Sequence, residues 1–335
     1  MVFFLKKLAV GLFLSSFFFL MQAQAGIVEP IYKQLKDPTT GGQPSTVSMS
    51  ITPDGKKMFV LSHTRNKYYI YDLTTPFDLS TMDVSNRSEV DFVGDDPPSA
   101  SQIKDIEFNN DGTKVFVFGR DGTLHIHNLT TPYDVASISS STAVPDDGLD
   151  YNTAYGTVSR IHGVTFNNDG TKMYLSDGTI TSTDITQVNL STPFDPSSGT
   201  STYNLNTESI TARYTMDLAF DDDGTRLYLS ESNVGVAINY MYVWKLSNPF
   251  ELSSATYVDK WQILGNGNNL SPYAWTFGNN GMKLYIGTED ASTDGDNIIY
   301  EYDLSCPYGI VLCESETSSV ASAQVEIAKN VIHQN

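Results

Sequence analysis

DIEFNNDGTKVFV, which runs from Asp105 to Val117, is one of five copies of a single pattern: an apolar strand, a tight polar turn and a second apolar strand. The other copies occupy residues 48–60, 163–175, 217–229 and 274–286. Asp or Asn followed by Gly tolerates the positive φ that a tight hairpin needs. The flanking residues alternate between apolar and polar, as half-buried strands do. Because the turn glycines lie 54 to 58 residues apart, the pattern indicates a repeat architecture.

One aromatic position recurs in the second strand of every copy, and we expect it to fill one layer of the core. It is occupied by Phe59, Phe116, Tyr174, Tyr228 and Tyr285. A third strand then ends in a Pro-aromatic turn such as LTTPFD at Leu73–Asp78. The proline lacks a backbone donor and stops ladder pairing. A weaker fourth strand is predicted in each connection, for example at Glu89–Val93 or Tyr257–Leu264.

Five antiparallel four-stranded units arranged radially form an all-β, five-bladed β-propeller. Residues 31–35 (IYKQL) resemble the fourth-strand segment at residues 260–264 (KWQIL), and no such segment follows the third strand of the last copy. The N-terminal segment is therefore predicted to pair beside that strand and to close the ring. A linear solenoid is the alternative, but it would need distinct caps at both ends.

The repeated Phe-x-x-Asp-Gly-Thr-Lys-Met-Tyr-Leu units, each followed by Tyr-x-Leu-Ser-Thr-Pro-Phe-Asp or a variant of it, carry a family resemblance. They resemble the propeller repeats of secreted bacterial proteins in the broad WD40-like, YVTN-like and lactonase-like group. The resemblance covers roughly residues 27–309 and implies the propeller fold. It is weak for function, because such repeats serve many tasks.

The first 25 residues have the features of a secretory signal peptide. Lys6 and Lys7 precede an apolar run from Leu8 to Met21, and Ala23–Ala25 gives the small-x-small cleavage pattern. A retained membrane anchor is the alternative, although the run is short for a full span. We expect export to the periplasm, the cell surface or the medium. The predicted division is a signal peptide at residues 1–25, a propeller at 26–309 and a tail at 310–335.

The chain is strongly acidic, with a net charge of −19. Removal of Lys6 and Lys7 with the signal peptide takes the mature chain to −21. Such a charge repels nucleic acid and anionic lipid, which are polyanions. We therefore expect no nucleic-acid partner. Because the apolar run is removed with the signal peptide, we expect no membrane span in the mature chain.

The only two cysteines, Cys306 and Cys313, are predicted to form a disulfide. Cys306 replaces the Thr or Asn that precedes the turn proline in the other copies, and export makes oxidation available. Val320–Ile332 has apolar residues at roughly helical spacing, which predicts a short amphipathic helix or a frayed terminal one. The segment from Cys306 onward resembles the linker before an autotransporter-type barrel. That resemblance implies a C-terminal membrane-anchoring domain missing from this sequence.

No specific catalytic motif is present, whether a Gly-rich phosphate loop, His-Glu-x-x-His or Gly-x-Ser-x-Gly. The residues where the innermost strands begin differ between copies, and we expect a ligand site at this mouth of the central channel. The candidates are Lys104, Asp105, Arg160, His162, Tyr214, Asp217 and Tyr273.

No cofactor is required by the sequence, although one loop has the carboxylates that calcium prefers. Its candidate ligands are Glu289, Asp290, Asp294 and Asp296. The loop does not have EF-hand spacing. His125 and His127 share one strand face, but two side chains are too few for a metal site.

Two functions fit these observations. The first is a binding or structural module with a protein or glycan ligand, acting at the cell surface or in the periplasm. The second is a propeller enzyme, a lactonase or a glycan-cleaving hydrolase. It would use Asp105, Asp217 or Glu107 as acid or base, with Arg160 and His162 binding substrate. The absence of a catalytic motif favours the binding module.

Overall fold

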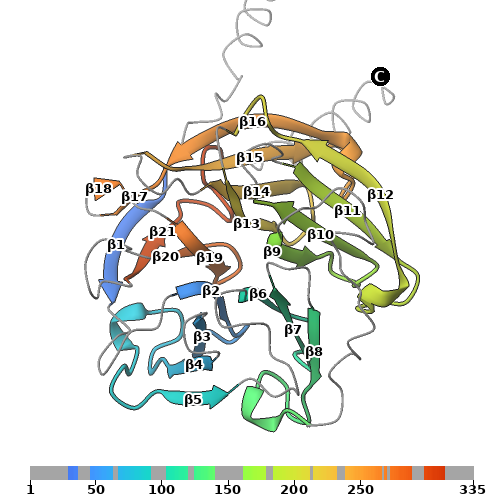
Figure 1. The fold of residues 1–335 in the computed structure, drawn as a ribbon. Coiled ribbons are helices and arrows are strands. Elements are labelled where there is room, and N and C mark those ends of the chain that lie inside the picture. Colours follow the sequence, from blue (N-terminus) through green and yellow to red (C-terminus); the bar gives the residue numbers. More distant parts are fainter. Residues whose placement is uncertain are drawn as a thin grey trace, which may run out of the picture. The chain divides into compact units, whose positions relative to one another are not determined.

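The computed structural model (Figure 1) describes most of the region that carries the repeats. The described residues are 29–36, 46–62, 67–91, 103–119, 124–139, 161–178, 184–211, 214–231, 238–265, 268–269, 272–288 and 298–313. The predicted signal peptide and the predicted helix at Val320–Ile332 lie outside them. In the described part of the chain no helix is long and apolar enough to cross a membrane.

Four blades are described with four antiparallel strands each, and blade 2 with three. Blade 1 consists of β2 (Thr46–Ile51), β3 (Lys57–Ser62), β4 (Lys67–Asp72) and β5 (Ser88–Asp91). Blade 2 consists of β6 (Ile103–Phe108), β7 (Lys114–Gly119) and β8 (Leu124–Asn128). Blade 3 consists of β9 (Ile161–Phe166), β10 (Lys172–Asp177), β11 (Asp184–Leu190) and β12 (Gly199–Asn206).

The last two blades complete the ring. Blade 4 consists of β13 (Thr215–Phe220), β14 (Arg226–Glu231), β15 (Tyr240–Leu246) and β16 (Ala255–Gln262). Blade 5 consists of β19 (Pro272–Gly278), β20 (Lys283–Thr288), β21 (Ile299–Asp303) and the N-terminal β1 (Ile31–Lys36). A small hairpin, β17 (Leu264–Gly265) and β18 (Asn268–Asn269), lies between them in sequence. Short 3₁₀ turns follow the third strands at η1 (Leu79–Thr81), η2 (Val135–Ser137), η3 (Pro196–Ser198) and η4 (Leu252–Ser254).

The innermost strands surround a central channel, and each contacts the inner strand of the next blade (Figure 1). β19 contacts β2, so blade 5 meets blade 1. The predicted five-bladed ring is therefore confirmed. So is the predicted closure, because β1 pairs antiparallel with β21.

One buried carboxylate joins the three chain segments that meet at the closure. The Glu301 side chain on β21 is 1% exposed and lies 2.5 Å from Lys283 Nζ of its own blade. Its other oxygen accepts hydrogen bonds from Gln34 Nε2 of β1 at 2.6 Å and from the Leu79 N–H of blade 1 at 2.8 Å. A hydrogen bond to a charged group is roughly twice as strong as a neutral one, so Glu301 stabilises the closure.

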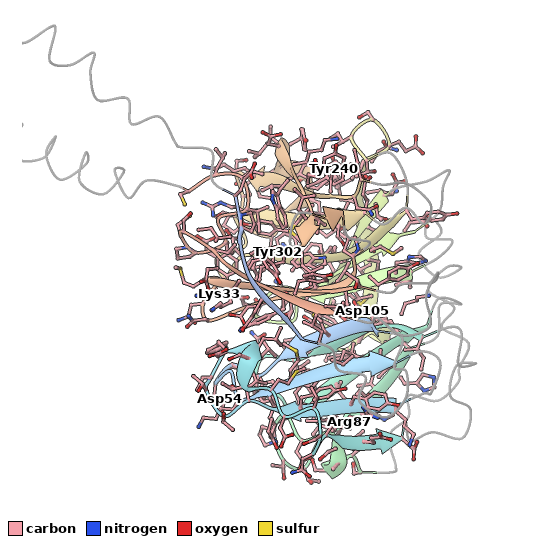
Figure 2. The ribbon with its side chains drawn as sticks, turned by 90° about the vertical axis from the view of Figure 1, so that its left-hand side faces the viewer. Lys33, Asp54, Arg87, Asp105, Tyr240 and Tyr302 are labelled. Carbon is pink, nitrogen blue, oxygen red and sulfur yellow. The ribbon has the colours of Figure 1, made fainter. Side chains whose placement is uncertain are left out.

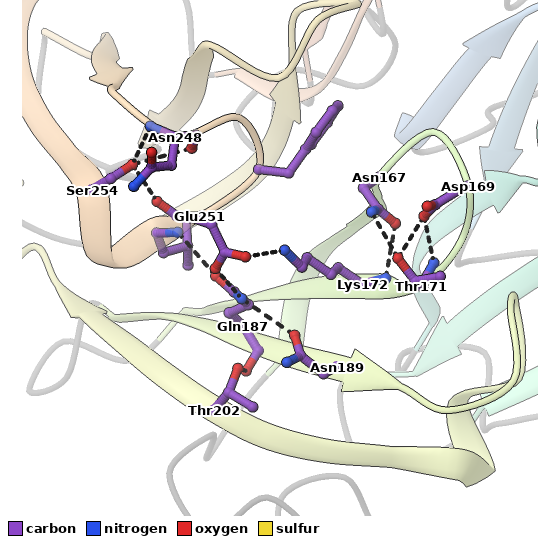
Figure 3. Close-up of polar contacts among 12 residues, drawn as sticks. Asn167, Asp169, Thr171, Lys172, Gln187, Asn189, Thr202, Asn248, Glu251 and Ser254 are labelled. Atoms are coloured by element: carbon purple, nitrogen blue, oxygen red, sulfur yellow. Dashed lines mark hydrogen bonds and ion pairs between the residues drawn. The ribbon is translucent and has the colours of Figure 1, made fainter.

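A related contact joins blades 3 and 4 (Figure 3). Gln187 on β11 accepts the Leu252 N–H at 2.9 Å and donates to Glu251 at 3.0 Å. Lys172 on β10 forms an ion pair with the same Glu251. Polar side chains of one blade therefore bind the 3₁₀ turn of the next at both interfaces.

Each hairpin glycine lies under an aromatic ring of its own blade. Gly112 has a φ of +68°, and a Cβ built there would overlap the ring of Tyr133. Tyr133 itself has a φ of +57° and donates its N–H to the Gly112 carbonyl at 2.9 Å. The same contact recurs in the pairs Gly55–Phe77, Gly170–Phe194, Gly224–Phe250 and Gly281–Tyr308. The two sequence signatures of the repeat therefore pack together as one unit.

The predicted aromatic layer connects neighbouring blades. Tyr174 of blade 3 packs on Phe220 of blade 4 at 4.6 Å, and its hydroxyl donates to the Phe250 carbonyl at 2.6 Å. Tyr228 donates to the Tyr308 carbonyl and Tyr285 to the Phe77 carbonyl, both at 2.7 Å. All five residues predicted for this layer are at most 1% exposed, as expected. Figure 2 shows that side chains occupy the spaces between the strands.

The predicted disulfide is also present, because Cys306 and Cys313 are bonded to each other. Cys306 lies in the last Pro-aromatic turn, next to Pro307. The bond closes a loop of a few residues, so we expect it to contribute less than the roughly 3 kcal/mol of a 15-residue loop.

We predict that Gly112→Val destabilises the protein by roughly 2–4 kcal/mol. A β-branched residue strongly disfavours positive φ, and its side chain would also overlap the Tyr133 ring. Urea unfolding of the purified mature chain measures the change. Thr256→Val introduces the same side chain on the exposed face of β16 and should change stability by less than about 0.5 kcal/mol. If the two variants are equally stable, the close packing of Gly112 against the Tyr133 ring is contradicted.

Candidate functional site

A cavity of about 330 Å³ lies among the five inner strands. Equivalent positions of the repeat form its wall, and they are occupied by Ser50, Glu107, Thr165, Ala219 and Thr276. Asp105 and Asp217 lie two residues earlier on their strands and line the same cavity. None of the described lining residues is Lys, Arg or His.

Asp105 fixes three inner strands relative to one another. Its Oδ1 accepts hydrogen bonds from the Ser48 hydroxyl of blade 1 at 2.6 Å and from the Ile106 N–H of its own strand at 2.8 Å. Its Oδ2 accepts the Val164 N–H of blade 3 at 2.7 Å. The Ile106 N–H also donates to the Ser48 hydroxyl at 3.1 Å, whereas Asp105 is the acceptor of the Val164 N–H. A buried N–H without an acceptor is costly. Asp105 therefore has a structural role at the channel wall.

Asp217 has the corresponding role between blades 4 and 5. It accepts the Leu218 N–H at 2.8 Å and the Trp275 N–H of β19 at 3.3 Å. The Trp275 indole Nε1–H donates to the Asp217 carbonyl at 3.3 Å and to the Ser230 hydroxyl at 3.0 Å. Trp275 is 3% exposed, so it packs in the core as its strand position indicates.

Glu107 is the third carboxyl of the cavity and accepts a hydrogen bond from the Thr165 hydroxyl at 3.3 Å. Burial raises the pKa of Asp105 to about 7. Burial, and then the charge of Asp105, raise the pKa values of Glu107 and Asp217 well above the usual range. Burial therefore favours the protonated form of these carboxyls, and a protonated carboxyl can both donate and accept hydrogen bonds.

The hairpin turns at the ends of the inner strands form one mouth of the cavity. The Asn110 side-chain amide of blade 2 donates to the Asn168 carbonyl of blade 3. The Asn168 amide donates to the Asp222 carbonyl of blade 4 at 2.6 Å. The Tyr308 hydroxyl of blade 5 donates to the Asp222 carboxylate at 2.5 Å. The hairpin turns of blades 2, 3 and 4 are thus bonded in series, and Tyr308 bonds the last of them to blade 5.

A second cavity of about 210 Å³ lies at this mouth, where blades 4, 5 and 1 meet. It shares five lining residues with the larger one, so the two are contiguous. The shared residues are Ile51, Pro53, Asp222, Phe277 and Tyr308. Asn279 and Asn280 line only the smaller cavity.

The structure brings together some of the residues predicted from sequence and separates others. Asp105 and Asp217 line the large cavity, whereas the described Lys104, His162, Tyr214 and Tyr273 are not among its lining residues. His162 Nδ1 instead lies 3.1 Å from the Met216 sulfur. Arg160 and the calcium candidates Glu289, Asp290, Asp294 and Asp296 lie outside the described residues.

Sequence reasoning missed the turn residues of this mouth. Asn110, Asn168, Asp222, Asn279 and Asn280 all lie in hairpin turns, where the repeat pattern explains their residue types. One sequence feature could have indicated this mouth. The turn of the fifth copy reads Asn-Asn-Gly-Met, whereas the second and third copies read Asn-Asp-Gly-Thr.

Among the residues that the structure describes, no group of three or more His, Cys, Asp or Glu side chains is arranged to hold a metal ion. The carboxyls of Asp105 and Asp217 bind backbone N–H groups instead.

No protein-family model matches the sequence, and no curated protein matches it. Many solved structures are similar to this chain, and three of them serve as examples. A functionally unknown protein from Desulfotomaculum acetoxidans has a TM-score of 0.44 and 13% identity over 72% of this chain and 79% of its own. The β-propeller domain of Cps50 (Swd1) from Myceliophteria thermophila has a TM-score of 0.42 and 12% identity, over 82% of this chain and 74% of its own. Hydrazine synthase from Kuenenia stuttgartiensis has a TM-score of 0.40 and 13% identity, over 76% of this chain and 58% of its own.

The raised pKa values predict that the ring is less stable at neutral and alkaline pH than at mildly acidic pH. A carboxyl whose pKa is higher in the folded than in the unfolded state favours folding at low pH, and this contribution is lost as the pH rises through the folded pKa. For Asp105 this loss of stability occurs between about pH 4, the unfolded pKa, and about pH 7, the folded pKa. Glu107→Gln removes one of the interacting charges and keeps the shape. We expect its Tm at pH 8 to exceed that of the wild type by about 2–4 °C, with a smaller gain at pH 5.

Calorimetric melts at both pH values test this prediction. Glu208→Gln, which removes an exposed carboxylate, is the matched control and should melt as the wild type does. If Glu107→Gln has the same pH profile as the wild type, the carboxyl cluster does not limit stability.

Proposed function

We propose that this chain is an exported binding module that takes a ligand at the hairpin-turn mouth of its central channel. The two contiguous cavities carry the proposal. Ligand sites are concave and combine apolar walls with a few convergent polar groups. The mouth provides both, with the rings of Phe277 and Tyr308 beside the carboxylate of Asp222.

The chemistry of the lining favours binding over catalysis. Asp105 and Asp217 each accept backbone N–H groups from a neighbouring blade, so their oxygens are engaged in holding the ring together. The net charge of −19 disfavours a polyanionic partner. A protein or glycan ligand fits this surface. The signal-peptide pattern supports export, and the Cys306–Cys313 disulfide is compatible with it.

Glu107 favours a second candidate, a hydrolase acting on lactones or glycans. Its carboxyl lines the cavity with a raised pKa, which is a property of general acids. Under this alternative, chromogenic glycosides or lactones are hydrolysed by the mature chain, and Glu107→Gln abolishes the reaction.

Filling the cavity tests the binding proposal. Ala219 lies on the wall of the larger cavity, and Ala219→Trp should occupy much of its volume. We expect at least one class in a panel of sugars, short peptides and small amines to raise the Tm of the wild type. The same compounds should no longer stabilise the Ala219→Trp variant.

Thr256→Trp places the same side chain on the exposed edge of blade 4 and controls for nonspecific effects. Far-UV circular dichroism confirms that each variant is folded. Stabilisation that survives Ala219→Trp would place the binding site elsewhere, and a panel without any stabilising compound would count against a binding module.

A further inference from the structure

The fifth hairpin turn departs from the other four in backbone conformation. In blades 1 to 4 the turn glycine donates its N–H to the residue three positions earlier, as Gly112 does to Asn109. In blade 5 the bond is instead between the Met282 N–H and the Asn279 carbonyl. Asn279 and Asn280 both have positive φ, at 52° and 51°. Asparagine adopts positive φ more readily than most residues, and the other four hairpin turns have positive φ at their glycine alone.

The same turn has lost the side-chain bonds that stabilise its equivalents. In blade 2 the Asp111 carboxylate accepts hydrogen bonds from the N–H and the hydroxyl of Thr113, and blades 3 and 4 repeat this contact. In blade 5 Asn280 and Met282 occupy these two positions. Met282 has no hydroxyl, and its N–H donates to the Asn279 carbonyl instead, so neither of these two bonds forms with the Asn280 side chain.

Asn279 is released in a similar way. Its equivalents Asn110 and Asn168 each donate to the carbonyl of the following turn. Neither Asn279 nor Asn280 makes a side-chain hydrogen bond with any residue that the structure describes, and both are exposed. Two free amides therefore lie side by side in the sequence at the edge of the smaller cavity.

The rest of this cavity supplies complementary groups. One oxygen of Asp222 accepts the Tyr308 hydroxyl, and the carboxylate has a second oxygen that can accept hydrogen bonds. The rings of Phe77, Phe277 and Tyr308 form the apolar part of the lining. Residues with amide donors, a carboxylate acceptor and aromatic rings thus line the same cavity, whose volume of about 210 Å³ suits a single ring-sized group.

We propose that this smaller cavity binds a neutral sugar residue, held by Asn279, Asn280 and Asp222. Adjacent hydroxyls of a sugar donate and accept at once, which matches an amide beside a carboxylate. The C–H face of a sugar ring is apolar and packs against aromatic side chains. The strongly negative chain disfavours sugars that carry carboxylate or sulfate. This proposal rests on the binding function proposed above and specifies its ligand.

A glycan array probed with the labelled mature chain tests the ligand class. The array carries glycans that end in neutral hexoses, N-acetylhexosamines or sialic acid. We expect binding to a subset that ends in neutral sugars and none to sialylated glycans. Titration calorimetry with the best oligosaccharide then gives its Kd for each variant.

The double variant Asn279→Gly/Asn280→Gly removes both amides and keeps a turn that tolerates positive φ. It should fold and bind at least about tenfold more weakly, the effect of about 1.4 kcal/mol. Asn86→Ala removes an exposed asparagine elsewhere and should bind as the wild type does. Asp222→Asn keeps the shape of the side chain and should also weaken binding.

The outcomes separate this inference from the proposed function. Unchanged glycan affinity in the double variant overturns the assignment of these asparagines. An array without any bound neutral glycan overturns the sugar ligand. If a peptide or amine then stabilises the wild type but not Ala219→Trp, the proposed binding function still holds. If no compound of any class binds, both the sugar ligand and the binding function are contradicted.

Discussion

The pairing of β1 with β21 is the contact on which the rest of the ring depends. These strands lie at opposite ends of the repeat region, and their union completes the last blade. Glu301 strengthens the union because it binds Gln34 of β1 and the Leu79 N–H of blade 1 at once. With blade 5 held against blade 1, the Tyr285 hydroxyl reaches the Phe77 carbonyl and the inner strands enclose the cavity.

The candidate binding site lies where the hairpin turns of blades 4 and 5 depart from the repeat pattern. A regular turn bonds to the next through an asparagine, as Asn168 does to the Asp222 carbonyl. This series ends at blade 4, because Asp222 has no side-chain N–H to donate. The turn of blade 5 then adopts another conformation, and the smaller cavity opens beside it. Departures from a local rule are expected at functional or strained sites, so a turn that differs from its four equivalents is a candidate for a binding site.

The sequence allowed the fold to be predicted because its main determinants are local. The Asp-Gly turns, the alternating strands and the IYKQL segment are each readable within a few residues, and so is the odd Cys306. The site was less accessible. Its strand position makes Asp105 a ligand-binding candidate, whereas its partners Ser48 and Val164, which lie 57 and 59 residues away, show that it bridges blades. The end of the channel at which a cavity forms depends on how side chains from five strands pack together, and no single repeat contains that information.

Hydrogen exchange of the backbone amides, read by mass spectrometry on the mature chain, tests the closed ring most directly. If β1 completes blade 5, peptides covering Ile31–Lys36 and Ile299–Asp303 should be protected to a degree similar to β10 in the middle of blade 3. The two closing strands should also lose protection together as denaturant is added. Rapid exchange of Ile31–Lys36 alongside a protected β10 would contradict closure of the ring by the N-terminal strand.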